Sequence, residues 1–337
     1  MPISRNTLII SVVIFLLLGA GVGWWWVSSP TTPPLPPPDN GDNRPPPPPD
    51  NDNNPPPAPA PFKAGDLNFV VLLTDDQRAD TLWAMPTVQK ELVAKGFNFT
   101  KAFASTPLCC PSRSGLLSGF NAYNTGVMNN FPPKGGATAF DDANTIAVLL
   151  KQQGYQTALL GKYLNNYTEA LAPYIPPGWD LFLDVEKGSW FNYDYVRGRS
   201  QASTAGTGQI LHNTLYNTYF IRDEALKFID QNADQPFFLY WAPKAPHGPA
   251  TAAPEDLNKF LDFKYNAPSL HEADVSDKPE YVRNKEYEDE DGEADDDHAD
   301  FPVKQLQSIQ AVDRSIKALI DKLAAKGILE KTVIIFA

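Results

Sequence analysis

The sequence predicts an α/β fold with a mixed, mostly parallel β-sheet between layers of helices. Two observations lead to this fold class. From Leu67 onward, apolar runs of strand length alternate with amphipathic segments of helix length, which is the pattern of strands joined by helical crossovers. The first run, residues 69–73, is apolar at every position, as expected for a strand buried on both faces of a parallel sheet.

Proline and glycine mark the ends of the predicted elements. Pro86 suits the first turn of a helix, while Gly96, Gly154 and Gly327 follow helical segments at positions where glycine commonly ends them. The predicted strands cover residues 69–73, 97–103, 156–160, 236–241 and 332–336, and the predicted helices cover residues 86–95, 144–153, 219–231 and 305–326. In such sheets, ligand sites form beyond the carboxyl ends of the strands.

Composition and charge narrow the classes of protein. The chain has 337 residues, of which 42% are hydrophobic, enough for a sizeable core. Most of the net charge of −12 lies in residues 272–300, so the chain as a whole is not a disordered acidic protein. No basic face is expected on the remainder, which argues against nucleic acid as a partner. Two cysteines are too few for a disulfide scaffold. The acidic residues 286–300 lack the spacing of a calcium-binding loop and are interpreted as a solvated insertion.

Residues 1–29 are predicted to form an N-terminal transmembrane anchor. Segment 8–27 has no charged residue and is long enough to cross a bilayer, and its tryptophans at positions 24–26 suit the headgroup layer. Arg5 favours a single-pass orientation with the N-terminus inside and the rest of the chain in the periplasm, at the cell surface or in a lumen. The alternative is a cleaved signal peptide, which would make the protein secreted, although Pro30 is unfavourable beside the cleavage site.

Residues 30–62 are predicted to be a disordered linker. Proline blocks alternate there with Asp/Asn clusters, and 16 of the 33 prolines lie between Pro30 and Pro61. Such a segment cannot bury enough apolar surface to fold. Its simplest role is to hold the globular part, residues 63–337, away from the membrane, and the alternative is a ligand for a proline-binding module.

Two adjacent aspartates, Asp75 and Asp76, follow the first predicted strand with only Thr74 between them. They therefore lie at the sheet edge where ligands are expected, and carboxylates are preferred ligands of hard cations. The alternative is a turn or a helix cap formed by an aspartate.

The two cysteines, Cys109 and Cys110, are adjacent and directly precede Pro111. Adjacent cysteines suggest a vicinal disulfide, a metal site or buried structural thiols, but no further cysteine exists to complete a metal set. Pro111 can open a helix, which places Cys109 at the amino end, where backbone N–H groups and the helix dipole favour an anion. Arg113 adds a forked cationic donor on the same turn.

The motif Cys-x-Pro-Ser-Arg at 109–113, followed by Leu-Leu-Ser-Gly at 116–119, resembles the signature of the type I sulfatases. In that family the first cysteine is oxidised to formylglycine. The resemblance therefore implies that Cys109 is the catalytic nucleophile, that Cys110 is the variable position, and that the fold is alkaline-phosphatase-like. The sequence Cys-Cys-Pro-Ser-Arg is similar to that of the N-acetylglucosamine-6-sulfatase branch.

Two further segments resemble motifs of that branch. Gly-Lys-Tyr-Leu-Asn at 161–165 makes Lys162 a cation for the substrate sulfate, and Ala-Pro-His at 245–247 makes His247 a sulfate ligand or proton donor. Without the family, Lys162 would be interpreted as a solvated lysine and His247 as a structural loop histidine. Many sulfatases carry a histidine two residues after the lysine, where this sequence has Leu164.

The resemblance implies a mechanism. Hydrated formylglycine at position 109 attacks the sulfur of a sulfate ester, beside one calcium ion held by Asp75 and Asp76. Arg113 and Lys162 neutralise the charge of the sulfate, and His247 protonates the leaving alcohol. The implied substrate is a sulfated sugar, of the glycosaminoglycan type or another sulfate ester. A formylglycine-generating enzyme is the implied partner for maturation.

The predicted catalytic domain, residues 63–337, is expected to be incomplete. The family places a Ser/Thr-Asp-Asn-Gly turn, with two more metal ligands, after a strand like 332–336, so these ligands are expected beyond Ala337. A chain ending there is expected to be inactive or poorly folded.

Two alternatives to sulfate ester hydrolysis remain open. One is a phosphonate or phosphate ester hydrolase of the same fold, and the other is an inactive, membrane-tethered anion-binding protein.

Aromatic residues could stack on a sugar, although at this density they are usually part of the core: Trp179, Trp190, Phe191, Tyr193 and Tyr195.

Overall fold

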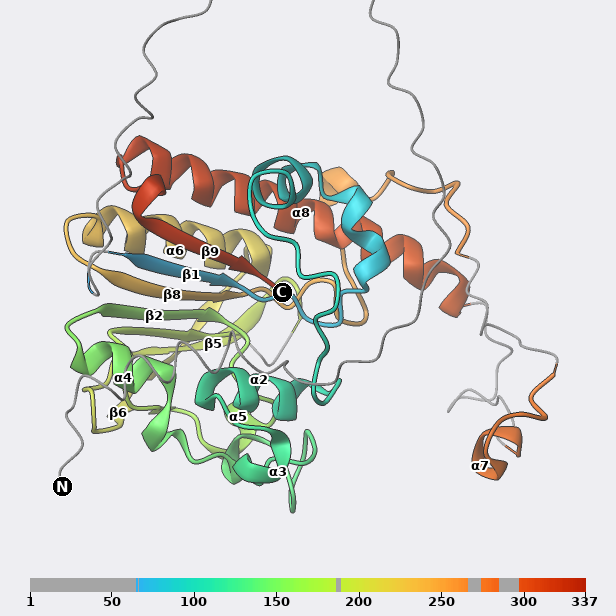
Figure 1. Cartoon of the computed structure of the whole chain (residues 1–337), viewed down its shortest axis with the longest axis horizontal. Coiled ribbons are helices and arrows are strands. Elements are labelled where there is room, and N and C mark those ends of the chain that lie inside the picture. The colour runs from blue at the N-terminus through green and yellow to red at the C-terminus, as the bar shows by residue number, and fades with distance from the viewer. Residues whose placement is uncertain (1–64, 66, 186–188, 266–273, 285–296) are drawn as a thin grey trace, which may run out of the picture. The chain divides into compact units, whose positions relative to one another are not determined.

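The computed structural model describes residues 65, 67–185, 189–265, 274–284 and 297–337 (Figure 1). Among the helices in these ranges, none is both long and apolar enough to cross a membrane. The predicted anchor segment 8–27, the predicted linker 30–62 and most of the acidic stretch 286–300 lie outside the described residues.

A seven-stranded sheet forms the centre of the described part (Figure 1). Its strands are β1 (Asn68–Leu72), β2 (Gln156–Gly161), β4 (Leu181–Asp184), β5 (Tyr193–Gly198), β7 (Gln209–Asn213), β8 (Phe237–Ala242) and β9 (Thr332–Phe336). The strand order is β7-β5-β4-β2-β8-β1-β9. The pairs from β4 to β9 are parallel, whereas β5 pairs antiparallel with both β4 and β7. The predicted mixed, mostly parallel sheet is confirmed.

Helices cover both faces of this sheet. Figure 1 shows α6 (Asn217–Asn232) and α8 (Asp297–Ala325) on one face, and α2 (Cys109–Ser118) and α4 (Ile146–Gln152) on the other. The shorter elements are α3 (Ala122–Thr125), α5 (Tyr167–Ala170), α7 (Glu280–Arg283), the strand pair β3 (Tyr174–Ile175) and β6 (Gly206–Thr207), a π-helical turn η2 (Val88–Val93), and 3-10 turns η1 (Ala79–Ala84), η3 (Ala137–Ala139), η4 (Asp142–Asn144), η5 (Pro254–Asp256) and η6 (Leu329–Lys331).

The core has two parts because side chains of a strand alternate between the faces of the sheet. In β1, Val70 and Leu72 pack with residues of α6 and α8, while Val71 packs with Leu117 of α2. Both sides of β1 and β8 are therefore apolar, which explains the continuous apolar runs of the sequence. The four predicted strands at 69–73, 156–160, 236–241 and 332–336 are confirmed within a residue or two.

The predicted strand at 97–103 is wrong. This segment forms local turns, closed by backbone hydrogen bonds from Thr100 to Asn98 and from Ala102 to Phe99. Alternating apolar residues form a strand only where a neighbouring strand supplies backbone partners, and no described strand pairs with this segment. Its phenylalanines are instead exposed: Phe97, Phe99 and Phe103.

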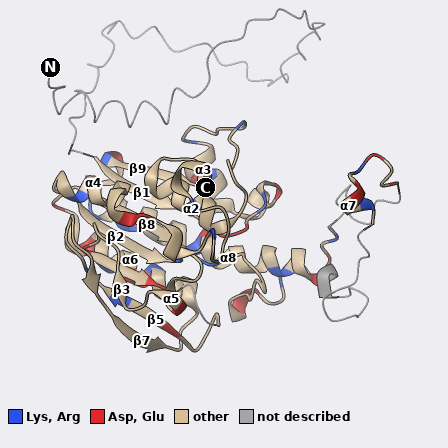
Figure 2. Cartoon of the chain, turned by 90° about the horizontal axis from the view of Figure 1, so that it is seen from below, with Lys and Arg blue, Asp and Glu red and all other residues tan. Residues whose placement is uncertain are grey.

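The aromatic residues noted for sugar stacking belong mostly to the core. Trp179, Trp190 and Tyr193 are at most 3% exposed. Trp179 stacks on Phe238 of β8 with ring centroids 6.0 Å apart, which is ordinary core packing. Figure 2 shows acidic and basic residues interspersed along the described elements.

Candidate active site

The candidate site lies beyond the carboxyl ends of β1, β2 and β8, beside the N-terminus of α2. β1 and β2 both pair with β8, so the loops that follow these three strands meet at one edge of the sheet. The backbone continues this pairing past the strands: Leu73 donates to Trp241, Lys162 donates to Ala242, and Asp75 donates to Ala245. Residues far apart in sequence are thereby held together.

Asp75 is the centre of a buried charge cluster. Its side chain is 4% exposed, and its carboxylate oxygens lie 2.6 Å from Lys162 Nζ and 3.3 Å from Arg113 Nη2. Burial raises the pKa of Asp75, but the positive charges of Arg113 and Lys162 outweigh this effect and lower it to about 2. Asp75 is therefore an anion at neutral pH, and both cations face it.

Lys162 reaches Asp75 because Gly161 lets the chain pass very close to β8. Gly161 has φ of +124°, and a Cβ on it would lie 2.0 Å from the carbonyl oxygen of Ala242. Another residue would have to push β2 away from β8. The Lys162 carbonyl also accepts a hydrogen bond from Arg113 Nη1 at 2.8 Å, which ties α2 to the end of β2.

Cys109 is the first residue of α2, as the position of Pro111 predicts. Its sulfur is half-buried and lies 4.0 Å from Asp76 Oδ1. Burial, and then the negative charge of Asp75, raise the pKa of the Cys109 thiol. As an unmodified residue it is therefore a neutral thiol at physiological pH, and not an activated thiolate nucleophile.

Asp76 and His247 face each other at the more open side of the site. His247 Nε2 lies 3.6 Å from Asp76 Oδ2, and His247 Nδ1 donates to the Gly248 carbonyl oxygen at 2.8 Å. Because the carbonyl can only accept, Nδ1 carries the hydrogen and Nε2 is left facing the site. Asp76 has φ of +58°, a backbone conformation that aspartate tolerates better than most residues.

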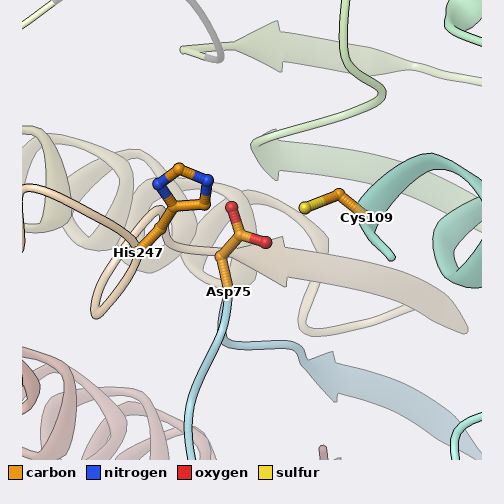
Figure 3. Close-up of side chains that lie close together, drawn as sticks. All are labelled: Asp75, Cys109 and His247. Carbon is orange, nitrogen blue, oxygen red and sulfur yellow. The ribbon is translucent and has the colours of Figure 1, made fainter. Parts of the chain in front are cut away.

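The sequence-predicted residues thus meet in one place. Asp75, Cys109 and His247 offer ligand atoms that all lie within 4.8 Å of one another, and Figure 3 shows the three side chains pointing toward a common point. The carboxylates of Asp75 and Asp76 suit a hard cation, whereas a thiol does not. The two oxygens of a formylglycine hydrate at position 109 would suit that cation, so the residues fit the implied metal.

Two contacts that sequence reasoning missed hold the start of α2 in place. Asn130 Oδ1 accepts the backbone N–H of Cys110 at 2.8 Å, and the fully buried Cys110 sulfur accepts the backbone N–H of Asn165 at 3.1 Å. Burial raises the pKa of Cys110 to about 11, so this thiol stays neutral. Asn165 belongs to the 161–165 motif, but nothing in the local sequence links Asn130 to α2.

Comparison with known proteins identifies the family. The family model described as "Sulfatase" matches residues 67–337, most of the chain. The chain belongs to the sulfatase family. The alkaline-phosphatase-like α/β fold predicted from the resemblance is confirmed.

Its relatives are named as sulfatases, one of them for a sulfated sugar. The chain is 32% identical over 283 residues to a putative extracellular sulfatase Sulf-1 homolog of Caenorhabditis elegans, covering 80% of this chain and 38% of that protein. It is 33% identical over 208 residues to human N-acetylglucosamine-6-sulfatase, covering 57% and 36%. The chain thus spans less than half the length of these curated relatives.

A solved structure has a similar architecture. The protein in a complex described as containing its substrate, D-glucosamine-2-N,6-O-disulfate, superposes with a TM-score of 0.61 at 20% identity, covering 81% of this chain and 65% of that one. At this identity the likeness extends to the fold alone.

Proposed function

We propose that this protein hydrolyses sulfate esters of a sugar or of a glycosaminoglycan-type substrate. The observation that carries the proposal is the convergence of Asp75, Cys109 and His247, with Lys162 and Arg113 bound to Asp75, at the carboxyl edge of the sheet. Membership of the sulfatase family and the names of its relatives support this choice of reaction.

The charges of the site suit an anionic substrate once a divalent cation is present. Asp75 and Asp76 offset the charges of Lys162 and Arg113, so the protein groups alone are nearly neutral. Calcium, the metal we propose, would be held by Asp75, Asp76 and residue 109 and would make the site positive, which attracts a sulfate ester. Formylglycine formed from Cys109 would supply a hydrated aldehyde as the nucleophile.

The remaining residues have separate roles in this proposal. Arg113 is fully buried and holds both Asp75 and the Lys162 carbonyl, so it fixes the spacing between α2 and β2. Lys162 adds positive charge where the sulfate oxygens become more negative. His247, with its Nδ1–H held by Gly248, presents Nε2 to the leaving alcohol oxygen. In the imidazolium form Nε2 also carries a proton, which passes to that oxygen as its bond to sulfur breaks and leaves the neutral Nδ1–H ring.

The test is sulfate release by the full natural protein. Glucosamine 6-sulfate and 4-nitrophenyl sulfate are incubated with enzyme produced alongside a formylglycine-generating enzyme, with calcium or with a chelator. We expect release with calcium, its loss in the chelator and an aldehyde at position 109 by peptide mass. Release of phosphate from phosphate or phosphonate esters, and not of sulfate, would favour the related ester hydrolases; binding of sulfate without turnover would favour a binding protein.

We also propose that residues 8–27 anchor the protein in a membrane with the catalytic part extracytoplasmic. The uncharged length of the segment and its tryptophans support this location. The test is carbonate extraction of membranes from producing cells, followed by protease treatment of intact cells. A protein found only in the medium, beginning near Pro30, would instead indicate a cleaved signal peptide.

A further inference from the structure

An exposed group of aromatic rings lies on the chain that follows the candidate metal ligands. Trp83 belongs to η1, the first turn after Asp76, and is 55% exposed. Its ring contacts Phe260 edge-on, with centroids 5.7 Å apart, and Phe263 at 5.8 Å. An indole exposed to this degree on the loop beside a catalytic site suggests contact with a ligand.

The rings of Phe260 and Phe263 are held in place by the core and by α8. Phe260 and Phe263 are partly buried against the core cluster that includes residues of α8. Gln307 of α8 donates hydrogen bonds of 2.8 Å to the carbonyl oxygens of both Leu257 and Lys259, which holds the segment that carries the two phenylalanines. Trp83 therefore packs on two phenylalanines whose positions are fixed.

A cation continues this surface toward the site. The Arg78 guanidinium lies 4.0 Å from the centre of the Tyr265 ring, and its Nη1 donates to Gln305 Oε1 at 2.9 Å. Gln305 Nε2 in turn donates to the Asp76 carbonyl oxygen at 3.4 Å, so Arg78 is coupled to the backbone of a candidate metal ligand. Arg78 Nε binds Asp80, but a guanidinium has five N–H donors and can hold a further anion.

We propose that Trp83, Phe260, Phe263, Tyr265 and Arg78 form an aromatic strip that binds sugar units of a sulfated glycan next to the unit being hydrolysed. A pyranose has one apolar face of C–H groups, which packs on an indole ring, and its sulfate groups match the forked guanidinium of Arg78. The strip rests on the proposed function, and it makes the substrate a glycan chain of several sugars.

The combination of rings and cation favours a sulfated glycan over a purely apolar partner. An apolar peptide would use Trp83 and the phenylalanines but gain nothing from Arg78 at the end nearer the site. Arg78 lies against Tyr265 and is coupled through Gln305 to the backbone of Asp76, so it offers a cation beside the site to an anionic glycan.

The experiment compares one long and one short substrate in the full natural enzyme. Sulfate release is measured from a sulfated tetrasaccharide and from 4-nitrophenyl sulfate for the wild type, Trp83→Ala and Arg78→Gln. Ile210→Ala is the matched control, because Ile210 is also 55% exposed but lies on β7, at the far edge of the sheet. We expect Trp83→Ala to raise KM for the tetrasaccharide about 10-fold and to leave KM for 4-nitrophenyl sulfate unchanged. We expect Arg78→Gln to weaken the salt dependence of KM for the tetrasaccharide.

Equal kinetics of wild type and Trp83→Ala on both substrates would overturn the strip while leaving the proposed function intact. If neither the wild type nor any variant releases sulfate, the proposed function fails, and the strip is then tested by binding. Cys109→Ala protein is titrated with the tetrasaccharide and compared with Cys109→Ala/Trp83→Ala. Loss of binding in the double variant supports the strip, and equal binding overturns it. Protection of Trp83 from oxidative footprinting in the absence of glycan would show that other polypeptide covers the strip, which also overturns the inference.

Discussion

The antiparallel end of the sheet and its parallel part each carry a histidine beside an aspartate, but only one pair belongs to a charge cluster. On the antiparallel end, His212 Nδ1 lies 2.8 Å from Asp194 Oδ1, and both side chains are more than half exposed. In the parallel part, His247 and Asp76 are 3.6 Å apart, the looser contact, yet they lie beside Asp75, which is buried with Arg113 and Lys162.

The difference shows that a short contact does not make a site. His212 and Asp194 are directly opposite each other in the β5–β7 register, so ordinary strand pairing explains their contact. His247, Asp75 and Lys162 come from loops after three different strands and converge because those strands are parallel neighbours. Convergence from several elements, with burial of charge, is the feature that indicates chemistry.

The largest expected effect concerns position 109. Cys109→Ala and Cys109→Ser should abolish sulfate release, because alanine has no group that can be oxidised to the proposed aldehyde and serine lacks the thiol that the proposed maturation step oxidises. Cys110→Ala is the matched control and should retain turnover, since its sulfur points to Asn165 and away from the candidate ligands. Steady-state sulfate release and the peptide mass of residues 102–113 provide the measurement; equal loss from both cysteine variants would refute the assignment.

The next effect compares the two histidines directly. His247→Ala should lower kcat by about 100-fold or more, the usual contribution of a proton donor, while His212→Ala should change kcat less than about twofold. The loss in His247→Ala should be smaller for 4-nitrophenyl sulfate, whose leaving group needs little protonation. A large effect of His212→Ala would show that the antiparallel end also takes part in the reaction.

A smaller effect is expected for stability at the start of α2. Cys110→Ala leaves the Asn165 N–H without its sulfur acceptor, which should cost about 1 kcal/mol of unfolding free energy. Cys110→Ser keeps an acceptor and should lose less. Chemical denaturation of both variants gives the comparison, and an unchanged midpoint for Cys110→Ala would mean that the contact contributes nothing.

The smallest effect concerns the cation–carboxylate group of the antiparallel end. Glu224 binds Lys227 and Arg197 of β5; burial raises the pKa of Glu224, but these hydrogen bonds and charges leave it below the ordinary value of 4.5. Its contribution to stability is therefore complete above pH 4.5 and is lost as pH falls through the lowered pKa.

Unfolding midpoints measured against pH test this prediction. The stability difference between wild type and Glu224→Gln should shrink below pH 4.5, with no change in kcat at neutral pH. Glu280→Gln, at an exposed position of α7, is the control. A difference that stays constant down to pH 3 would contradict the lowered pKa.

Strands β1, β2 and β8 were predictable from sequence because burial on both faces leaves continuous apolar runs, whereas the parallel strand β4 was missed. Asp75, Lys162 and His247 each lie in the loop that follows such a run, so their meeting at one edge followed from topology. The geometry of Cys109 was predictable from Pro111, since proline is favoured in the first turn of a helix.

The antiparallel strands β5 and β7 were missed because their side chains are mixed in burial and leave no regular pattern. The alternating phenylalanines at 97–103 predicted a strand, but pairing depends on a partner that local sequence does not reveal. Asn130 was missed because it acts through a contact with a residue 20 positions away. Trp83 was missed because only its exposure distinguishes it from the aromatic residues of the core.

The backbone hydrogen bonds of Leu73, Asp75 and Lys162 extend the β-ladder past the ends of the strands and into the loops that carry the candidate catalytic groups. These loops therefore share the rigidity of the most buried strands. Their amides should exchange with solvent hydrogen as slowly as those of β8, through opening of the central ladder as one unit. Any agent that loosens the pairing of β1 with β8 would then dismantle the chemistry and the core in a single event.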